Sequence, residues 1–160
     1  MMAAEPKFLL LDEPFSALDT YLKEKLMQEM MTYLNQFKKG VIMVSHSRDE
    51  VYQMCTDTAI MHQGILETVG KTKEIFDNPG TVNAARLTGC KNISKAEKLS
   101  ESEVYALEWD IKLTFPEHIK IPSNLTHVGI RAHEIRPVKF SDIDNNTSIK
   151  LNICLLYTSD

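Results

Sequence analysis

The sequence predicts an α/β protein that begins with a parallel strand–helix–strand unit and continues into a small β domain. Two short, continuous apolar runs, at 8–11 and 41–44, are typical of buried strands. The segment between them, from residue 20 onward, has helical periodicity. Because a strand–helix–strand connection ordinarily makes a parallel pair, both strands should end at the same edge of one sheet.

The helix between these strands has its own start and stop signals. Asp19 is a suitable N-cap, and Gly40 suits the position just beyond the last turn, where Lys38 and Lys39 would favour the helix dipole. Its apolar positions are Leu22, Leu26, Met30, Leu34 and Phe37. The sequence therefore predicts a helix from residue 20 to the end of this apolar series.

Shorter elements follow. Ser47-Arg48-Asp49-Glu50 matches a capping box and predicts a second helix. A hairpin is expected over 58–69, with Gly64 at its turn. Two short helices are then expected over 71–76 and 82–87, followed by strands over 104–107, 111–115, 127–131 and 148–156. The change in character at Gly89 divides the expected domains into 1–89 and 90–160, and the second, with its last strand running to Leu156, is expected to be incomplete.

Composition limits the possible functions. The 160 residues are 43% hydrophobic and 25% charged, which is ordinary for a soluble chain, and the net charge of −4 gives no support for nucleic-acid binding. No apolar run approaches the ~20 residues of a membrane span. Cys55, Cys90 and Cys154 are scattered, which favours a reducing compartment over disulfides or a zinc site.

Polar residues follow both predicted strands. Asp12 and Glu13 come directly after the first strand, and Ser45 and His46 come after the second. Ligands in open α/β sheets bind at the carboxyl ends of strands. One carboxylate can hold Mg²⁺, the other can polarise a water, and a nearby histidine can hydrogen-bond a phosphate. The arrangement predicts a site for nucleotide hydrolysis.

The order of these motifs closely resembles a known family. Leu-Leu-Leu-Asp-Glu-Pro-Phe-Ser-Ala-Leu-Asp at 9–19, followed after one helix by Val44-Ser45-His46, is similar to the Walker B, D-loop and H-loop series of ABC transporter ATPases. The segment 88–92 resembles the linker to a regulatory domain in importer-type subunits, and 128–137 resembles a motif of that domain. The similarity covers about residues 3–140 and is nearest to the molybdate/sulfate type.

The resemblance implies a fold and a set of roles. Residues 1–89 would be the C-terminal part of a P-loop NTPase domain (RecA-like, ABC-type), and 90–160 part of a TOBE/OB-like domain. Asp12 would hold Mg²⁺ through water, Glu13 would be the general base and His46 the switch histidine. Asp19 would lie in the D-loop of a homodimer that sandwiches ATP. The subunits would dock on transmembrane permeases at the cytoplasmic face of the membrane.

Other motifs of the family are not found in this sequence. The family has a Walker A loop, a Q-loop and a signature motif before Walker B, and none occurs here. Gly70-Lys71-Thr72 matches only the tail of a Walker A motif, whose first glycine would fall at Ile65, so we interpret it as the start of a helix. We therefore expect the chain to be a C-terminal fragment that is inactive toward ATP by itself.

Two other functions remain open. The β domain could be a non-catalytic regulatory or oxyanion-binding module on an ATPase remnant. An ABC ATPase of the DNA-repair kind is disfavoured by the absence of basic patches. The transported solute is not specified by these residues, although the resemblance to molybdate/sulfate-type importers suggests molybdate or another oxyanion.

Overall fold

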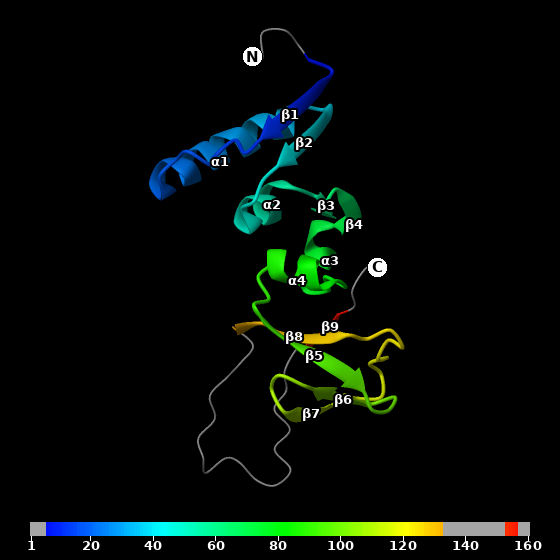
Figure 1. Ribbon diagram of the computed structural model, residues 1–160. Coiled ribbons are helices and arrows are strands. Elements are labelled where there is room, and N and C mark those ends of the chain that lie inside the picture. The colour runs from blue at the N-terminus through cyan, green and yellow to red at the C-terminus, as the bar shows by residue number, and fades with distance from the viewer. Residues whose placement is uncertain (1–5, 133–152, 157–160) are drawn as a thin grey trace. The chain divides into compact units, whose positions relative to one another are not determined.

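The computed structural model describes residues 6–132 and 153–156 of the chain (Figure 1). The chain divides into two compact units, Met1–Thr56 and Asp57–Asp160. The expected motif residues 133–137 and the first part of the expected last strand, 148–152, lie outside the described residues. Among the helices that are described, none has the length and apolar character needed to cross a membrane.

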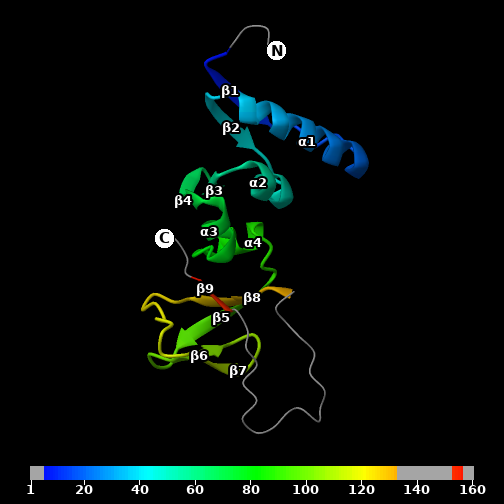
Figure 2. The ribbon, with the colours of Figure 1, turned by 180° about the vertical axis from the view of Figure 1, so that it is seen from behind.

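The first unit contains the predicted strand–helix–strand arrangement. Strand β1 (Phe8–Asp12) pairs in parallel with β2 (Gly40–Val44), and helix α1 (Thr20–Gln36) connects them. Helix α2 (Arg48–Met54) follows β2. Figures 1 and 2 show α1 lying beside the two strands. The parallel register confirms that both strands end at the same edge of the sheet.

Buried apolar residues in this unit are few. Leu9 of β1, Phe15 of the following turn and Met27 of α1 are buried. On the other face of the strands, Leu10 is 67% exposed and Ile42 is 51% exposed. Exposure therefore alternates along each strand, so the continuous apolar runs of the sequence do not correspond to strands buried on both faces in this structure.

The helix ends agree with the sequence in part. Asp19 is the N-cap of α1, because its carboxylate accepts a hydrogen bond from the backbone N–H of Leu22 at 3.0 Å. The expectation for Gly40 was wrong, since α1 ends at Gln36 and Gly40 is the first residue of β2. The predicted capping box does start α2, but the hydroxyl of Ser47 makes no capping hydrogen bond.

The second unit begins with the predicted hairpin. Strands β3 (Asp57–His62) and β4 (Ile65–Lys71) are antiparallel, and Gly64 in their turn has a φ of 79°, which favours glycine. Helices α3 (Thr72–Asp77) and α4 (Val82–Leu87) follow. Gly70 and Lys71 end β4 and Thr72 starts α3, as expected for a helix start. The ammonium of Lys71 lies 2.7 Å from the carboxylate of Asp57, which occupies it.

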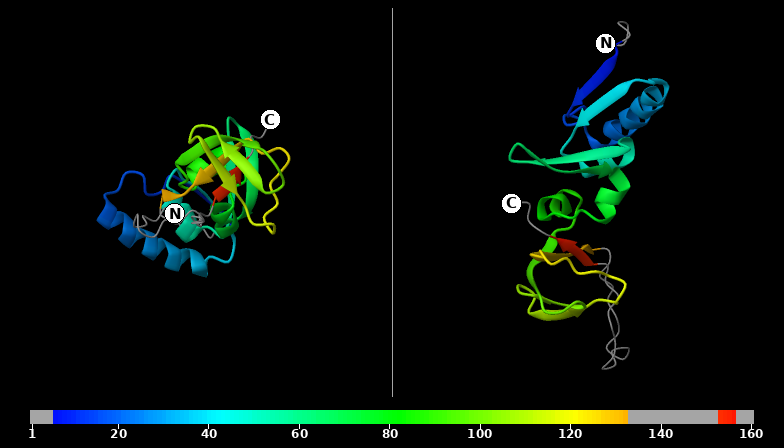
Figure 3. Two further views of the ribbon diagram at one scale, coloured as in Figure 1. Left: turned by 90° about the horizontal axis from the view of Figure 1, so that it is seen from below. Right: turned by 90° about the vertical axis from the view of Figure 1, so that its right-hand side faces the viewer.

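A five-stranded antiparallel sheet follows these helices in the described part of the second unit. Its order is β7-β6-β5-β8-β9, and its curvature is visible in Figure 3. The strands are β5 (Asn92–Lys98), β6 (Glu103–Ala106), β7 (Ile111–Thr114), β8 (His127–Ile130) and β9 (Ile153–Leu156). The largest core cluster of the unit contains Ala96, Val104, Ala106, Leu113, Phe115, Ile121, Leu125 and Val128.

The central strand β5 was not predicted. Its buried positions are Ser94 and Ala96, and Ile93 is only partly buried, so the strand lacks the alternating large apolar residues on which a strand prediction depends. It is central because β6 and β8 pair with it on either side. Tertiary pairing, which local sequence does not reveal, determines this strand.

Candidate functional site

The ends of β1 and β2 bring the predicted site residues together. Asp12 lies opposite Val44 in the parallel register, and the N–H of Glu13 donates to the carbonyl of Val44 at 2.9 Å. The chain therefore stays paired one residue beyond the end of β1. Glu13 and His46, which are far apart in sequence, leave the sheet at the same place.

The backbone at Glu13 turns sharply away from the strand. Its φ of 45° lies in the left-handed region, which costs a residue other than glycine about 1–3 kcal/mol. The carbonyl of Glu13 accepts hydrogen bonds from the N–H and the hydroxyl of Ser16. Phe15, which is only 2% exposed, anchors the turn in the core of this unit. The strained conformation is thus held by hydrogen bonds and by burial.

Glu13 and His46 are in direct contact. One carboxylate oxygen of Glu13, Oε1, accepts a hydrogen bond from the backbone N–H of His46 at 2.7 Å. The Nε2 atom of the His46 ring lies 3.5 Å from the same oxygen, and the His46 side chain is 93% exposed. The main chain of His46 is therefore fixed on Glu13, whereas its imidazole is accessible to a ligand.

Asp12 and Asp19 differ in what they contact. Asp12 is exposed and, within the described part of the chain, its carboxylate has no hydrogen-bond or ion-pair partner. Asp19 caps α1 through the N–H of Leu22. No group of three or more metal-binding side chains occurs in the ranges 6–132 and 153–156. A cation at Asp12 would thus need water or ligand oxygens, as Mg²⁺ commonly uses.

Sequence reasoning missed a charged cluster next to His46, which is centred on the buried residue Glu50. Glu50 is only 2% exposed. Its carboxylate lies 2.5 Å from the ammonium of Lys23 and accepts a 2.5 Å hydrogen bond from the hydroxyl of Ser45. Burial acts to raise the pKa of Glu50, but the hydrogen bonds from Lys23 and Ser45 and the charge of Lys23 outweigh it, so this pKa is lowered.

The capping-box pattern explains why this cluster was missed. It assigned Glu50 to the cap of its own helix, where a glutamate would be exposed. Glu50 in fact pairs with Lys23 on α1, 27 positions earlier in the chain. Only a pairing prediction between α1 and α2 could have found the cluster, since no local pattern joins these two positions.

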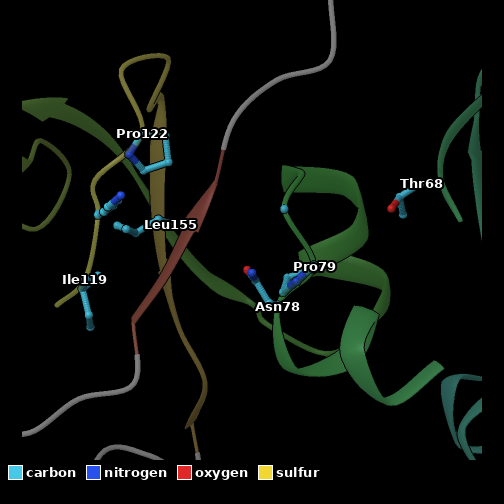
Figure 4. Close-up of a pocket in the computed structure, with 8 residues that line it drawn as sticks. Thr68, Asn78, Pro79, Ile119, Pro122 and Leu155 are labelled. Carbon is cyan, nitrogen blue, oxygen red and sulfur yellow. The ribbon is translucent and has the colours of Figure 1, made fainter. Parts of the chain in front are cut away.

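A cavity of about 460 Å³ in the second unit contains none of the predicted site residues. Figure 4 shows Asn78 and Pro79 on one side of it, and Ile119, Pro122 and Leu155 on the other. Lys120 and Thr68 are also among the residues that line it. The cavity is therefore a separate feature, with polar groups but no arrangement typical of nucleotide hydrolysis.

Comparisons with known proteins identify the family. The chain is 31% identical over 150 residues, 94% of its length, to a sulfate/thiosulfate import ATP-binding protein of Mesostigma viride. It is 34% identical over 113 residues to a spermidine/putrescine import ATP-binding protein of Mycoplasmopsis synoviae, covering 71% of the chain and 25% of that relative. The chain belongs to the ABC importer ATP-binding subunits. A molybdate/tungstate import ATP-binding protein of Pyrococcus abyssi is 31% identical over 144 residues, 88% of the chain and 40% of the relative.

The similarity establishes the importer-type ABC family without selecting a solute. The relatives are named for polyamines, sulfate and thiosulfate, molybdate and tungstate, and ferric ions. The chain spans between 25% and 41% of the length of these curated relatives. No protein-family model matches the chain. The resemblance to ABC importer ATPases noted in the sequence is thus confirmed at the level of the family.

Proposed function

We propose that this chain supplies the hydrolytic half of the ATP site in an ABC importer ATP-binding subunit. The observation that carries the proposal is the contact between Glu13 and His46 at the shared edge of β1 and β2. Because the His46 amide occupies Oε1 of Glu13, the other oxygen, Oε2, is left without a partner among the described residues. That oxygen can accept a proton from an attacking water.

The four site residues have distinct roles in this proposal. Glu13 is the general base, and the exposed imidazole of His46 contacts the terminal phosphate. Asp12, whose carboxylate is exposed, holds Mg²⁺ through water. A bound Mg²⁺ ion would neutralise charge on the phosphate oxygens. Asp19 lies at the start of α1 and would face a second ATPase subunit across the homodimer.

The rest of the subunit is proposed from the family. The partners would be transmembrane permease subunits at the cytoplasmic face of the membrane, with no nucleic acid involved. We place the boundary between the ATPase part and the regulatory TOBE/OB-like part near residue 90, just before the five-stranded sheet starts at Asn92. Molybdate or another oxyanion is the proposed solute, supported by relatives named for sulfate and for molybdate.

A chimeric subunit tests the proposal. The segment of the Mesostigma viride relative that precedes its matched region would be joined to this chain, and ATP hydrolysis measured. We expect Glu13→Gln to lower the rate on the order of 10²–10⁴-fold, as for the loss of a general base. Asp49→Asn is a matched control, because the Asp49 side chain is 73% exposed and outside the site. A chimera that hydrolyses ATP equally well with Glu13→Gln would contradict the proposal.

The 160-residue chain by itself should neither bind nor hydrolyse ATP appreciably, because its sequence has no Walker A loop to hold the phosphates. Calorimetry with ATP, sulfate and molybdate separates this expectation from the alternative of a regulatory oxyanion-binding module. The cavity beside Lys120 is the observation that favours the alternative. Binding of molybdate or sulfate that is lost in Lys120→Ala would support it.

A further inference from the structure

We propose that Glu50 is a positioning residue, which fixes the loop after β2 so that the backbone N–H of His46 is held on the carboxylate of Glu13. The inference rests on the proposed function, because it gives Glu50 a role in arranging the two groups proposed for catalysis. It is derived from the contacts that join the buried Glu50 to the partly exposed Lys23, Ser45 and Ser47, and these four residues are called the Glu50 cluster.

Both oxygens of the Glu50 carboxylate are engaged. Oε1 lies 2.5 Å from the ammonium of Lys23, and Oε2 accepts the hydroxyl hydrogen of Ser45 at 2.5 Å. The Glu50 side chain is 3% exposed, whereas that of Lys23 is 28% exposed. A buried carboxylate is tolerated only where such partners replace water. The positions of Lys23 and Ser45 are therefore dictated by the charge of Glu50.

The Glu50 cluster holds the residues on both sides of His46. Ser45 is bound to Glu50 through its hydroxyl, and the same hydroxyl oxygen accepts a hydrogen bond from the N–H of Ser47 at 3.0 Å. The ammonium of Lys23 donates to the hydroxyl of Ser47 at 3.3 Å. His46 lies between these two serines, and its own side chain is 93% exposed. Its backbone is thus placed by its neighbours.

The cluster also joins the loop to the start of α1. Lys23 lies in the first turn of that helix, and its backbone N–H donates to the carbonyl of Asp19 at 2.9 Å. Asp19 is the N-cap of the same helix. The ion pair between Lys23 and Glu50 therefore connects two segments of the proposed site, the D-loop end that carries Asp19 and the loop that carries His46.

A purely stabilising role for Glu50 makes a different prediction. If Glu50 only joined α1 to α2 through Lys23, Glu50→Gln in a folded variant would leave the hydrogen bond between His46 and Glu13 unchanged, and any effect of Ser45→Ala would come only from its lost bond to the N–H of Ser47. In a positioning role, Ser45 is the link between the ion pair and the His46 backbone. Ser45→Ala should then have the same effect on His46 as Glu50→Gln.

The test uses the full 160-residue chain and NMR at neutral pH, without nucleotide. The amide proton of His46 reports its hydrogen bond to Glu13, so the change in its chemical shift caused by Glu13→Ala measures that bond. This change would be measured in the wild-type, Glu50→Gln, Ser45→Ala and Ser45→Thr backgrounds. Asp49→Asn, on the same helix but exposed, is the matched control.

In the Glu50→Gln and Ser45→Ala backgrounds, we expect Glu13→Ala to change the His46 amide shift by less than about half of its change in the wild-type background. The reason is that a charge-assisted hydrogen bond weakens steeply once its donor moves. Ser45→Thr keeps the hydroxyl and should restore it. An undiminished change in folded Ser45→Ala or folded Glu50→Gln would overturn the proposal. If Glu50→Gln does not fold, the same measurement is made in Ser45→Ala and in the charge-balanced double variant Lys23→Met with Glu50→Gln, and an undiminished change in either would overturn the proposal. Since no nucleotide is involved, this result is independent of the ATPase measurement.

Discussion

The two units of the chain are stabilised by different means. In Met1–Thr56, few apolar side chains are buried, and the most buried residue of α2 is the charged Glu50, paired with Lys23. In Asp57–Asp160, the five-stranded sheet buries a contiguous apolar cluster, in which Val104 and Val128 are fully inaccessible. The first unit thus combines few buried apolar side chains with a buried, ion-paired carboxylate, whereas the largest core cluster of the second unit is apolar.

This difference is consistent with what each unit has to hold in place. A site for phosphate chemistry needs carboxylates at a strand edge, and hydrogen bonds with defined directions can orient the backbone that carries them. Apolar packing has no such direction. Variants that separate the two modes of stabilisation therefore test the comparison.

The largest effect is expected for Lys23→Met in the first unit. It leaves the carboxylate of Glu50, with a side chain only 3% exposed, without its cation. Breaking a buried ion pair at one partner costs about 3–5 kcal/mol of unfolding free energy. Hydrogen exchange of the α1 amides, which reports local unfolding of this unit, would measure the loss.

The double variant Lys23→Met with Glu50→Gln is the control for this prediction. It removes both charges, so no uncompensated carboxylate remains buried, and we expect much of the lost stability to return. If Lys23→Met alone were as stable as the wild type, the contrast between a polar first unit and an apolar second unit would be wrong.

The second unit should respond most to a cavity in its apolar packing. Leu156 of β9 is fully buried, and Leu156→Ala should cost about 2–5 kcal/mol of unfolding free energy. Trp109, the single tryptophan, packs against the core of this unit, so its fluorescence during urea unfolding reports the change. Leu107→Ala, at a leucine that is 42% exposed, is the matched control and should have little effect. Equal losses in the two variants would contradict the prediction.

The sequence predicted much of the first unit because its signals are local. The apolar runs gave β1 and β2, the helical spacing gave α1, and Asp19 was identified as its N-cap. The placement of Glu13 and His46 at one edge followed from the parallel connection. Their catalytic roles remain predictions, since they rest on the family resemblance.

What the sequence did not predict depends on contacts between distant segments. Glu50 and Lys23 meet because α1 and α2 come together, and no local pattern marks that pair. Strand β5 is central although its buried positions are Ser94 and Ala96, which are too small for a strong strand signal. The end of α1 at Gln36, before the expected glycine, shows how loosely local signals define a helix terminus.

A smaller effect is expected at the start of α1. Asp19→Ala removes the carboxylate that accepts the N–H of Leu22, and loss of such an N-cap typically costs about 1 kcal/mol. Asp19→Asn keeps an acceptor and should be close to the wild type. Exchange of the first-turn amides of α1 would measure both. A loss in Asp19→Asn equal to that in Asp19→Ala would show that the charge, not the cap, matters.

The smallest expected effect is a difference between the two units in how their stability changes with pH. Burial lowers the pKa of His127 in β8, assisted by Lys95 and Arg86 and opposed by Glu108. The folded state therefore binds a proton less readily than the unfolded chain, so stability falls as pH drops below the unfolded value of about 6.5. The lowered pKa of Glu50 also makes stability fall as pH decreases, but only below the ordinary glutamate pKa of about 4.3.

Between about pH 7 and pH 5, the second unit should therefore lose stability through His127, while Glu50 leaves the first unit unchanged. His127→Gln should remove this part of the pH dependence, measured by urea unfolding followed at Trp109. His118→Gln, at an exposed histidine of the same unit, is the control and should retain the dependence. If His127→Gln kept the full dependence, the loss would have to come from other groups, and the partial burial of His127 would not distinguish the second unit from the first.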